Sequence, residues 1–367
     1  MKALLAVLLI ISARAQLTNV PSWSELPADS TATTLRTDGT SYIRALQYAP
    51  PKPATTAAEL TAINPHLPRI LPDFNLLLAS AQLSSRYQQL YDTKHKEIRK
   101  GKLLTPHNYY DCETTLLLTH PTTQQKIFLL QSDMDVVTDG SDPGRSPSIS
   151  NYHLARTSDW FLPETSYSWV NKSATPNPFL NYYPETLTKL QKLRTQLEAE
   201  AAKDPGVVWR DMIRACDSQI YRVKERGLHS YTKTNLKQRR FLLATEDPFV
   251  VLPVPWVKSK AAFSPRMGDY AAVIYKDKIY PAILGDAGPS SKTGEASLRL
   301  AKELNPKANG KTRAVSDLSV TYLFFPKSAG PRSAPNLPQW HAKVTGLLNK
   351  IGGLGEGYTL HTWPEQE

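Results

Sequence analysis

The sequence predicts an α+β protein, with a compact β-barrel core, an N-terminal helical segment and a helical insertion. Short apolar runs of strand length lie on both sides of residue 200, and a long stretch between them has apolar residues at helical spacing. The composition, with 41% hydrophobic and 21% charged residues over 367 positions, is that of a globular chain. These observations exclude a disordered protein and a multi-span membrane protein.

The first 15 residues have the pattern of a secretory signal peptide. Lys2 provides the basic start, residues 3–11 are nine consecutive apolar residues, and Ala13-Arg14-Ala15 forms a small-x-small cleavage site. The apolar run is too short to span a bilayer as a helix. We therefore expect a secreted or periplasmic protein with no integral membrane span.

Two segments separate this signal from the predicted core. Residues 16–56 are rich in Ser, Thr and Pro and are expected to form an extended lead-in. Residues 57–104 form the N-terminal helical segment, in which apolar residues at helical spacing predict one helix over residues 72–96. That helix is expected to pack on the outside of the core.

The catalytic β core is predicted over residues 105–163 and 241–353. Its strand candidates are the apolar runs 114–119, 126–131, 248–253, 270–275, 279–284 and 320–325. The first two are joined by HPTTQQ and predict a hairpin. A last helix is expected over residues 339–350, and residues 354–367 form a C-terminal tail.

Residues 164–240 are expected to form an insertion built on a helical hairpin. Two amphipathic stripes, at residues 187–197 and 209–223, flank an Asp204-Pro205-Gly206 turn. The segment holds 14 Lys and Arg against 8 Asp and Glu, which is more than half of the net charge of +11. We expect this charge to face away from the cleft and to bind an anionic surface such as a cell wall, although an ordinary solvated helical face has the same pattern.

The basic balance of the chain also raises nucleic acid as a partner, but the predicted export argues against it. The only two cysteines, Cys112 and Cys216, would lie in a compartment that permits disulfides. Nothing in the sequence shows whether they meet.

Four aspartates fall within ten positions after the second predicted strand, in the run SDMDVVTDGSD that begins at Ser132. Asp133 and Asp135 would point to the same side if that strand continues. The cluster fits a divalent-cation loop, an acidic cleft wall for a cationic ligand, or a polar turn. The residues alone leave these three interpretations open.

A second pair of carboxylates lies near the end of the predicted strand 279–284. Asp286 follows this strand, and Glu295 is expected in the first turn of a helix, with Thr293 as its N-cap. Most glycoside hydrolases use a pair of carboxyl groups for catalysis. An ordinary turn and a helix cap, with Glu295 meeting the helix dipole, would show the same residues.

The runs ILGDAGPSSKTGEASLRLAKEL, SDMDVVTDG and DPFVVLP together resemble glycoside hydrolase family 75, the chitosanases first known from fungi. TSYSW and PNPFL, which start at Thr165 and Pro176, are similar to bacterial members with a helical insertion. The resemblance covers residues 105–163 and 240–330.

The resemblance implies a double-psi barrel and an endo-acting chitosanase that cleaves β-1,4-glucosamine linkages with inversion. Its catalytic Asp and Glu fall on Asp286 and Glu295, and we assign Glu295 as general acid and Asp286 as general base, although the two roles could be exchanged. The expected substrate is chitosan or partly deacetylated chitin. The predicted substrate-binding residues are Asp133, Asp135, Asp139, Trp169 and Tyr270.

Aromatic side chains could also serve as a floor on which sugars stack, and the candidates are Trp160, Tyr167, Trp169, Tyr270 and Trp340. No cofactor or metal is predicted, because the eight histidines lack paired metal spacing and no phosphate-binding loop or dinucleotide fingerprint occurs. Two other functions remain open from the residues: a non-catalytic polysaccharide- or cell-wall-binding protein, and a hydrolase of deacetylated peptidoglycan.

Overall fold

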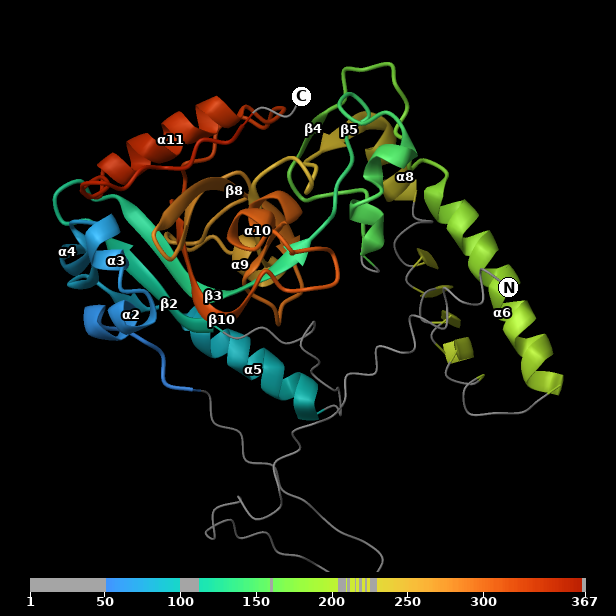
Figure 1. The fold of residues 1–367 in the computed structure, drawn as a ribbon, viewed down its shortest axis with the longest axis horizontal. Helices are drawn as coiled ribbons and strands as arrows, with labels where there is room; N and C mark the ends of the chain where they lie inside the picture. Colours follow the sequence, from blue (N-terminus) through green and yellow to red (C-terminus); the bar gives the residue numbers. More distant parts are fainter. Residues whose placement is uncertain are drawn as a thin grey trace, which may run out of the picture. The chain divides into compact units, whose positions relative to one another are not determined.

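Six strands close into a β-barrel in the computed structural model, which describes residues 51–99, 112–158, 161–203 and 230–364 and isolated residues between 209 and 224 (Figure 1). Around the barrel the order is β3 (Lys126–Val137), β10 (Val315–Phe324), β7 (Tyr270–Tyr275), β8 (Lys278–Gly288), β6 (Phe249–Pro253) and β9 (Glu295–Ser297). The ring closes because β9 pairs with both β6 and β3. The predicted α+β class with a barrel core is therefore confirmed.

Two further strands extend the sheet from β3, in the order β3, β2 (Cys112–Thr119) and β1 (Gln82–Leu83). The pairing of β2 with β3 is antiparallel, which confirms the predicted hairpin. All six predicted strands are present, and four of them are longer than their apolar runs. β3 continues to Val137 and β8 to Gly288, so the polar residues beyond each apolar run are also paired in the sheet.

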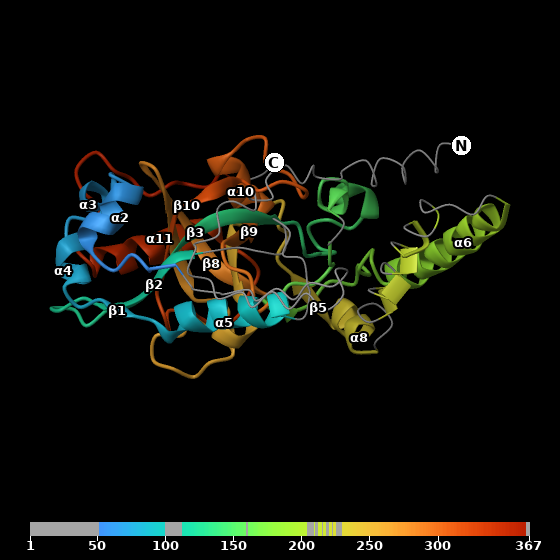
Figure 2. The same cartoon turned by 90° about the horizontal axis from the view of Figure 1, so that it is seen from below.

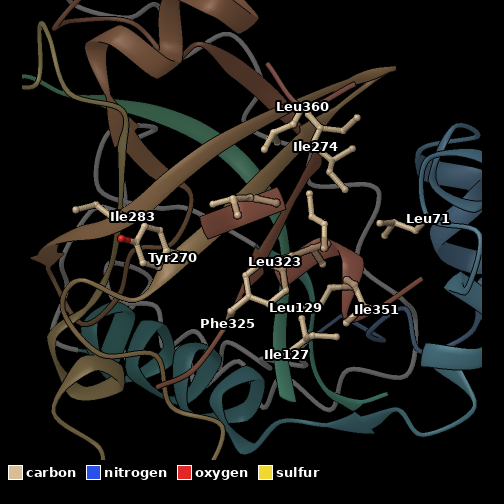
Figure 3. Packing of buried hydrophobic residues seen from close by; sticks show 14 of the residues in the cluster. Leu71, Ile127, Leu129, Tyr270, Ile274, Ile283, Leu323, Phe325, Ile351 and Leu360 are labelled. Atoms are coloured by element: carbon tan, nitrogen blue, oxygen red, sulfur yellow. The ribbon is translucent and has the colours of Figure 1, made fainter. Parts of the chain in front are cut away.

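The main hydrophobic core joins barrel side chains to helices at one end of the barrel. α2 (Ala57–Ile63), α3 (Leu67–Ile70), α4 (Phe74–Leu78) and α11 (Leu337–Asn349) contribute buried residues to this cluster (Figures 1 and 2). Figure 3 shows Ile127 and Leu129 of β3 with Leu323 of β10 and with Ile351, which follows α11. The predicted C-terminal helix is thus part of the core.

The single helix predicted over residues 72–96 is wrong. The chain forms α4, then the short strand β1, and then α5 (Ser85–Arg99). β1 pairs with β2, and the Ser84 backbone N–H donates to the carbonyl oxygen of Thr115 at 2.8 Å. Backbone pairing to the barrel therefore replaces the middle of the helix that the apolar spacing predicts.

Shorter elements complete the barrel domain. The 3-10 turns η1 (Ile149–Tyr152) and η2 (Ala155–Thr157) precede the insertion. α9 (Val254–Val257) follows β6, and α10 (Leu298–Leu304) follows β9 directly.

The insertion contains α6 (Tyr182–Lys203), α8 (Ser230–Gln238) and a small sheet of β4 (Ser168–Val170) with β5 (Arg239–Phe241). Cys216 donates from Sγ to the carbonyl oxygen of Leu190 at 3.3 Å, and Arg194 pairs with Asp217 at 2.6 Å. Described residues of the second stripe therefore pack against α6. The turn predicted at residues 204–206 lies outside the described residues.

The remaining N-terminal predictions are mostly outside the described part of the chain. This holds for the signal peptide over residues 1–15 and for residues 16–50 of the lead-in. At the end of the lead-in, Ala54 is buried, and its N–H donates to the carbonyl oxygen of Glu113. Cys112 and Cys216 are both buried, and no disulfide joins them. No described helix has the length and apolar character that crossing a membrane requires.

Candidate active site

A cavity of about 990 Å³ is lined by residues of the barrel strands β3, β9, β6 and β8 and of α8 in the insertion. Five carboxylate residues and three cationic residues line it. They are Asp135, Asp139, Glu164, Asp286 and Glu295, with Arg239, Lys292 and Arg332. The cavity is therefore locally acidic, although the whole chain carries a net charge of +11.

The strand register brings three of these carboxylates onto one face of the barrel wall. Asp135 of β3 pairs with Glu295 of β9, Glu295 pairs with Val251 of β6, and Val251 pairs with Asp286 of β8. Residues in register on neighbouring strands point to the same face. Glu295 and Asp286 are thus two strand spacings apart, which places their Cα atoms roughly 9–10 Å from each other.

A bulge at Gly285 is what turns Asp286 into the cavity. Along β6 and β8 the register runs from Val250 opposite Leu284 to Val251 opposite Asp286, so Gly285 is one extra residue in β8. Without this residue, Asp286 would point to the opposite face, because side chains alternate along a strand. A Cβ at Gly285 would lie 2.5 Å from Cδ1 of Leu242, so only glycine fits here without displacing its neighbours.

Glu295 lies in a poorly hydrated part of the cavity. Its side chain is only 14% exposed, and burial raises its pKa to about 7. The nearby charges of Asp135 and Asp286 raise the pKa further, whereas Lys292, whose Nζ lies 3.7 Å from Oε1, lowers it. A carboxyl with this pKa retains its proton close to neutral pH and can donate it.

Glu295 belongs to β9 and not to a helix, which corrects the prediction from sequence. α10 begins only at Leu298, and its N-cap is Ser297, whose Oγ accepts from the N–H of Leu300. Thr293, the predicted cap, is buried, with its hydroxyl 3.1 Å from that of Ser132. The helix dipole therefore does not favour the ionised form of Glu295 in the way the sequence suggested.

Asp286 has the opposite environment. Its Oδ1 accepts three hydrogen bonds, from the N–H of Ser166 at 2.8 Å, the hydroxyl of Ser166 at 2.6 Å and the N–H of Ala287 at 2.7 Å. Hydrogen bonds donated to a carboxylate stabilise its charged form. The two carboxyls therefore have different environments: burial favours the protonated form of Glu295, whereas donated hydrogen bonds favour the charged form of Asp286.

The model of the family described as "Fungal chitosanase of glycosyl hydrolase group 75" matches residues 134–358, which is more than half of the chain. The chain belongs to glycoside hydrolase family 75. It is therefore a chitosanase-type glycoside hydrolase, in agreement with the resemblance of the sequence motifs. A search of the curated proteins finds no match.

In this family 75 member, the four clustered aspartates have separate roles. Asp135 lines the cavity, and so does Asp139, whose Oδ1 accepts from the N–H of Leu162 at 2.8 Å. Asp133 is fully buried outside the cavity lining, and its Oδ2 pairs with Arg313 at 2.9 Å. Asp142 pairs with Arg145, also at 2.9 Å.

This separation argues against the cation-loop interpretation. Among the described residues, no group of three or more His, Cys, Asp or Glu side chains could hold a metal ion. Asp135 and Asp139 remain candidates for substrate contacts. Asp133 does not, because its carboxylate is enclosed by protein.

The aromatic residues predicted as substrate contacts lie in the core. Trp169 and Tyr270 are each 8% exposed, belong to the main hydrophobic cluster and do not line the cavity. Figure 3 shows Tyr270 beside Ile283, its cross-strand partner. Tyr167 and Trp340 belong to the same cluster, and Trp160 lies outside the described residues. The only described aromatic residue in the cavity lining is Phe241.

Glu164 is a fifth carboxyl in the cavity, and no sequence motif marks it as a site residue. Burial and the charge of Asp286 raise its pKa to about 7, whereas a hydrogen bond from Asn235 of α8 lowers it. The available signal was its place directly before the TSYSW motif. Thr234, Asn235, Gln238 and Arg239 also line the cavity, so the C-terminal part of the insertion is a cavity wall and does not face away from it.

Proposed function

We propose that the chain is an exported, endo-acting chitosanase that hydrolyses β-1,4-glucosamine linkages with inversion. The observation that carries this proposal is the register that places Glu295 and Asp286 on the two sides of Val251, facing one cavity. Inverting enzymes hold their two carboxyls roughly 6.5–9.5 Å apart, to leave room for a water molecule. Two strand spacings between the Cα atoms suit that requirement.

Glu295 then acts as the general acid and Asp286 as the general base. Glu295 donates its proton to the glycosidic oxygen as the bond from that oxygen to the anomeric carbon breaks. Asp286 takes a proton from a water molecule whose oxygen attacks the anomeric carbon from the opposite face. The two products are a new chain end with a free hydroxyl and a reducing sugar of inverted configuration, and Glu295 and Asp286 have exchanged protonation states.

The charge of the cavity supports a cationic polymer as the substrate. Asp135 and Asp139 line the same space as the catalytic pair, so protonated glucosamine amines can form charge-assisted hydrogen bonds with them. The cavity is partly open and is lined by residues of both the barrel and α8, so it could take an internal stretch of a chain, as endo action requires.

The test is hydrolysis by the mature protein that starts at Gln16, against chitosan, chitin, cellulose and peptidoglycan. We expect reducing ends from chitosan, with the α-anomer appearing first by NMR because the β-linkage is inverted. Glu295→Gln and Asp286→Asn should each lower kcat by at least about 10²-fold, whereas Glu356→Gln, an exposed glutamate after α11, serves as control. First appearance of the β-anomer would indicate a retaining mechanism, and binding without hydrolysis would indicate a non-catalytic protein.

Export and surface binding are separate parts of the proposal. The signal-like residues 1–15 support export, and appearance of the processed chain in the medium or periplasm tests it. The basic excess of the insertion lies after α6, within residues 210–240, and would bind an anionic surface. Part of this charge is already used within the fold, since Arg240 contacts Asp142 and Asn171. Salt-dependent retention on an anionic matrix tests the remainder.

A further inference from the structure

We propose that Glu164 is a specificity residue, which binds the ammonium group of a glucosamine unit next to Asp286 and so makes this part of the cavity require a deacetylated sugar. The inference rests on the proposed function and deepens it. Glu164 lies beside Asp286, its carboxylate lacks one hydrogen-bond donor among the described residues, the negative charge of Asp286 acts on it, and a protonated substrate amine supplies both positive charge and donors.

Glu164 is held firmly beside the catalytic aspartate. On its N-terminal side, the carbonyl of Pro163 accepts from the hydroxyl of Ser141 at 2.6 Å. On its C-terminal side, the Thr165 hydroxyl donates to the carbonyl of Tyr167 at 2.9 Å, and Ser166 donates twice to Asp286. The backbone around Glu164 is therefore tied to the same element that orients the general base.

The carboxylate of Glu164 is incompletely satisfied. Its Oε1 is buried, and within the part of the chain that the structure describes it has no hydrogen-bond partner. Asn235 of α8 donates a hydrogen bond to the carboxylate, so the insertion orients it from the other side. A buried polar atom without a partner is costly, and a ligand that supplies a donor recovers that cost.

The missing partner is best supplied by a cation. The charge of Asp286 acts on Glu164, and two neighbouring carboxylates are both stabilised when a positive group lies between them. The three cations of the lining have contacts elsewhere: Lys292 with Glu295, Arg239 with the Ser168 hydroxyl, and Arg332 with the Ser166 carbonyl. A protonated sugar amine provides both the charge and the donors, whereas an N-acetyl group has no charge and only one N–H.

The first experiment compares wild type with Glu164→Gln on chitosans of defined acetylation. We expect the KM for fully deacetylated chitosan to rise about 10-fold or more, since a hydrogen bond to a charged group is lost, with kcat little changed. Sequencing of the product ends should show one subsite restricted to glucosamine in wild type and open to N-acetylglucosamine in the variant. Glu356→Gln should leave both measurements unchanged.

A binding measurement separates this inference from the proposed function. In a Glu295→Gln background, calorimetry should show that Glu164→Gln weakens binding of a glucosamine hexamer about 10-fold or more and leaves binding of the fully acetylated hexamer unaffected. Equal losses for both hexamers, or no loss for either, would overturn the inference.

The kinetic outcomes are equally distinct. If Glu164→Gln lowers kcat about 100-fold or more and leaves KM unchanged, Glu164 belongs to the chemical step and the inference is overturned. If wild type hydrolyses chitosan and Glu164→Gln changes neither KM nor hexamer binding, this inference alone is refuted. Wild type that binds the hexamer in a Glu164-dependent manner but releases no reducing ends refutes the proposed function alone.

Discussion

Replacing Glu295 by Gln should stabilise the protein at neutral pH while it abolishes activity. Burial holds the pKa of Glu295 at about 7 in the folded state, against 4.5 for the unperturbed group. Between these two values the folded state binds more protons than the unfolded state, so the free energy of unfolding falls as the pH rises through this window. The displacement corresponds to about 3 kcal/mol, fully lost above pH 7.

Glutamine has a similar shape and remains neutral, so it avoids this loss. We expect Glu295→Gln to match wild type near pH 4.5 and to exceed it at pH 7.5 by up to about 3 kcal/mol. The gain is reduced by loss of the contact with Lys292 at 3.7 Å, which stabilises only the charged carboxylate. Other buried carboxyls with a raised pKa, such as Asp133, occur in both proteins and cancel in the difference.

The assay is urea denaturation of wild type, Glu295→Gln and the control Glu356→Gln at pH 4.5 and pH 7.5. Glu356 is exposed, so its replacement should give the same difference from wild type at both values. A Glu295→Gln variant that is no more stable than wild type at pH 7.5 would refute the reasoning, because Glu295 would then not be held in an unfavourable environment.

Three further predictions concern the same cavity and its support. Lys292→Ala removes a cation that lowers the pKa of Glu295, so the alkaline limb of the kcat/KM profile should move to higher pH. Asp135→Asn removes a like charge that raises this pKa, so the alkaline limb should move to lower pH. A shift in the same direction for both variants would contradict this. Gly285→Ala should lower the free energy of unfolding by about 1–3 kcal/mol, because the new side chain overpacks against Leu242 and Phe249. It should also lower kcat more than it raises KM, because the bulge positions Asp286. Unchanged thermal melting and kinetics would show that the strand accepts a side chain there. Arg313→Ala should destabilise the protein by about 1–3 kcal/mol in denaturant titrations at neutral pH, because it removes the cation paired with buried Asp133, whose pKa of about 7 lets the carboxyl take up a proton in part compensation. No loss of stability would argue against a buried pair.

Most strands of the sheet could be predicted because each contains a local apolar run. The runs 114–119, 248–253 and 270–275 are buried in the sheet, and their lengths separate them from helices. β9 could not be predicted in this way. It has only three residues, and its conformation depends on pairing with β3 and β6, which are distant in sequence.

The proposed catalytic pair illustrates the same limit. Asp286 and Glu295 could be selected from their chemistry and from the resemblance, but their facing positions depend on one extra residue in β8 and on the β6–β9 pairing. Trp169 and Tyr270 have the right chemistry for sugar stacking, yet tertiary packing buries both. Glu164 has no motif of its own, and its proximity to Asp286 appears only in three dimensions.

The short length of β9 has a consequence for the thermal inactivation of the enzyme. The strand that closes the barrel, Glu295–Ser297, also carries the proposed general acid, and it pairs with its neighbours through only three residues. Local opening exposes such short segments before the rest of a domain unfolds. We therefore expect thermal inactivation to precede global melting, with amide exchange at β9 faster than in β3 or β10. Each local opening of β9 exposes Glu295 to water, so Glu295 should lose and regain its proton at the rate of that opening.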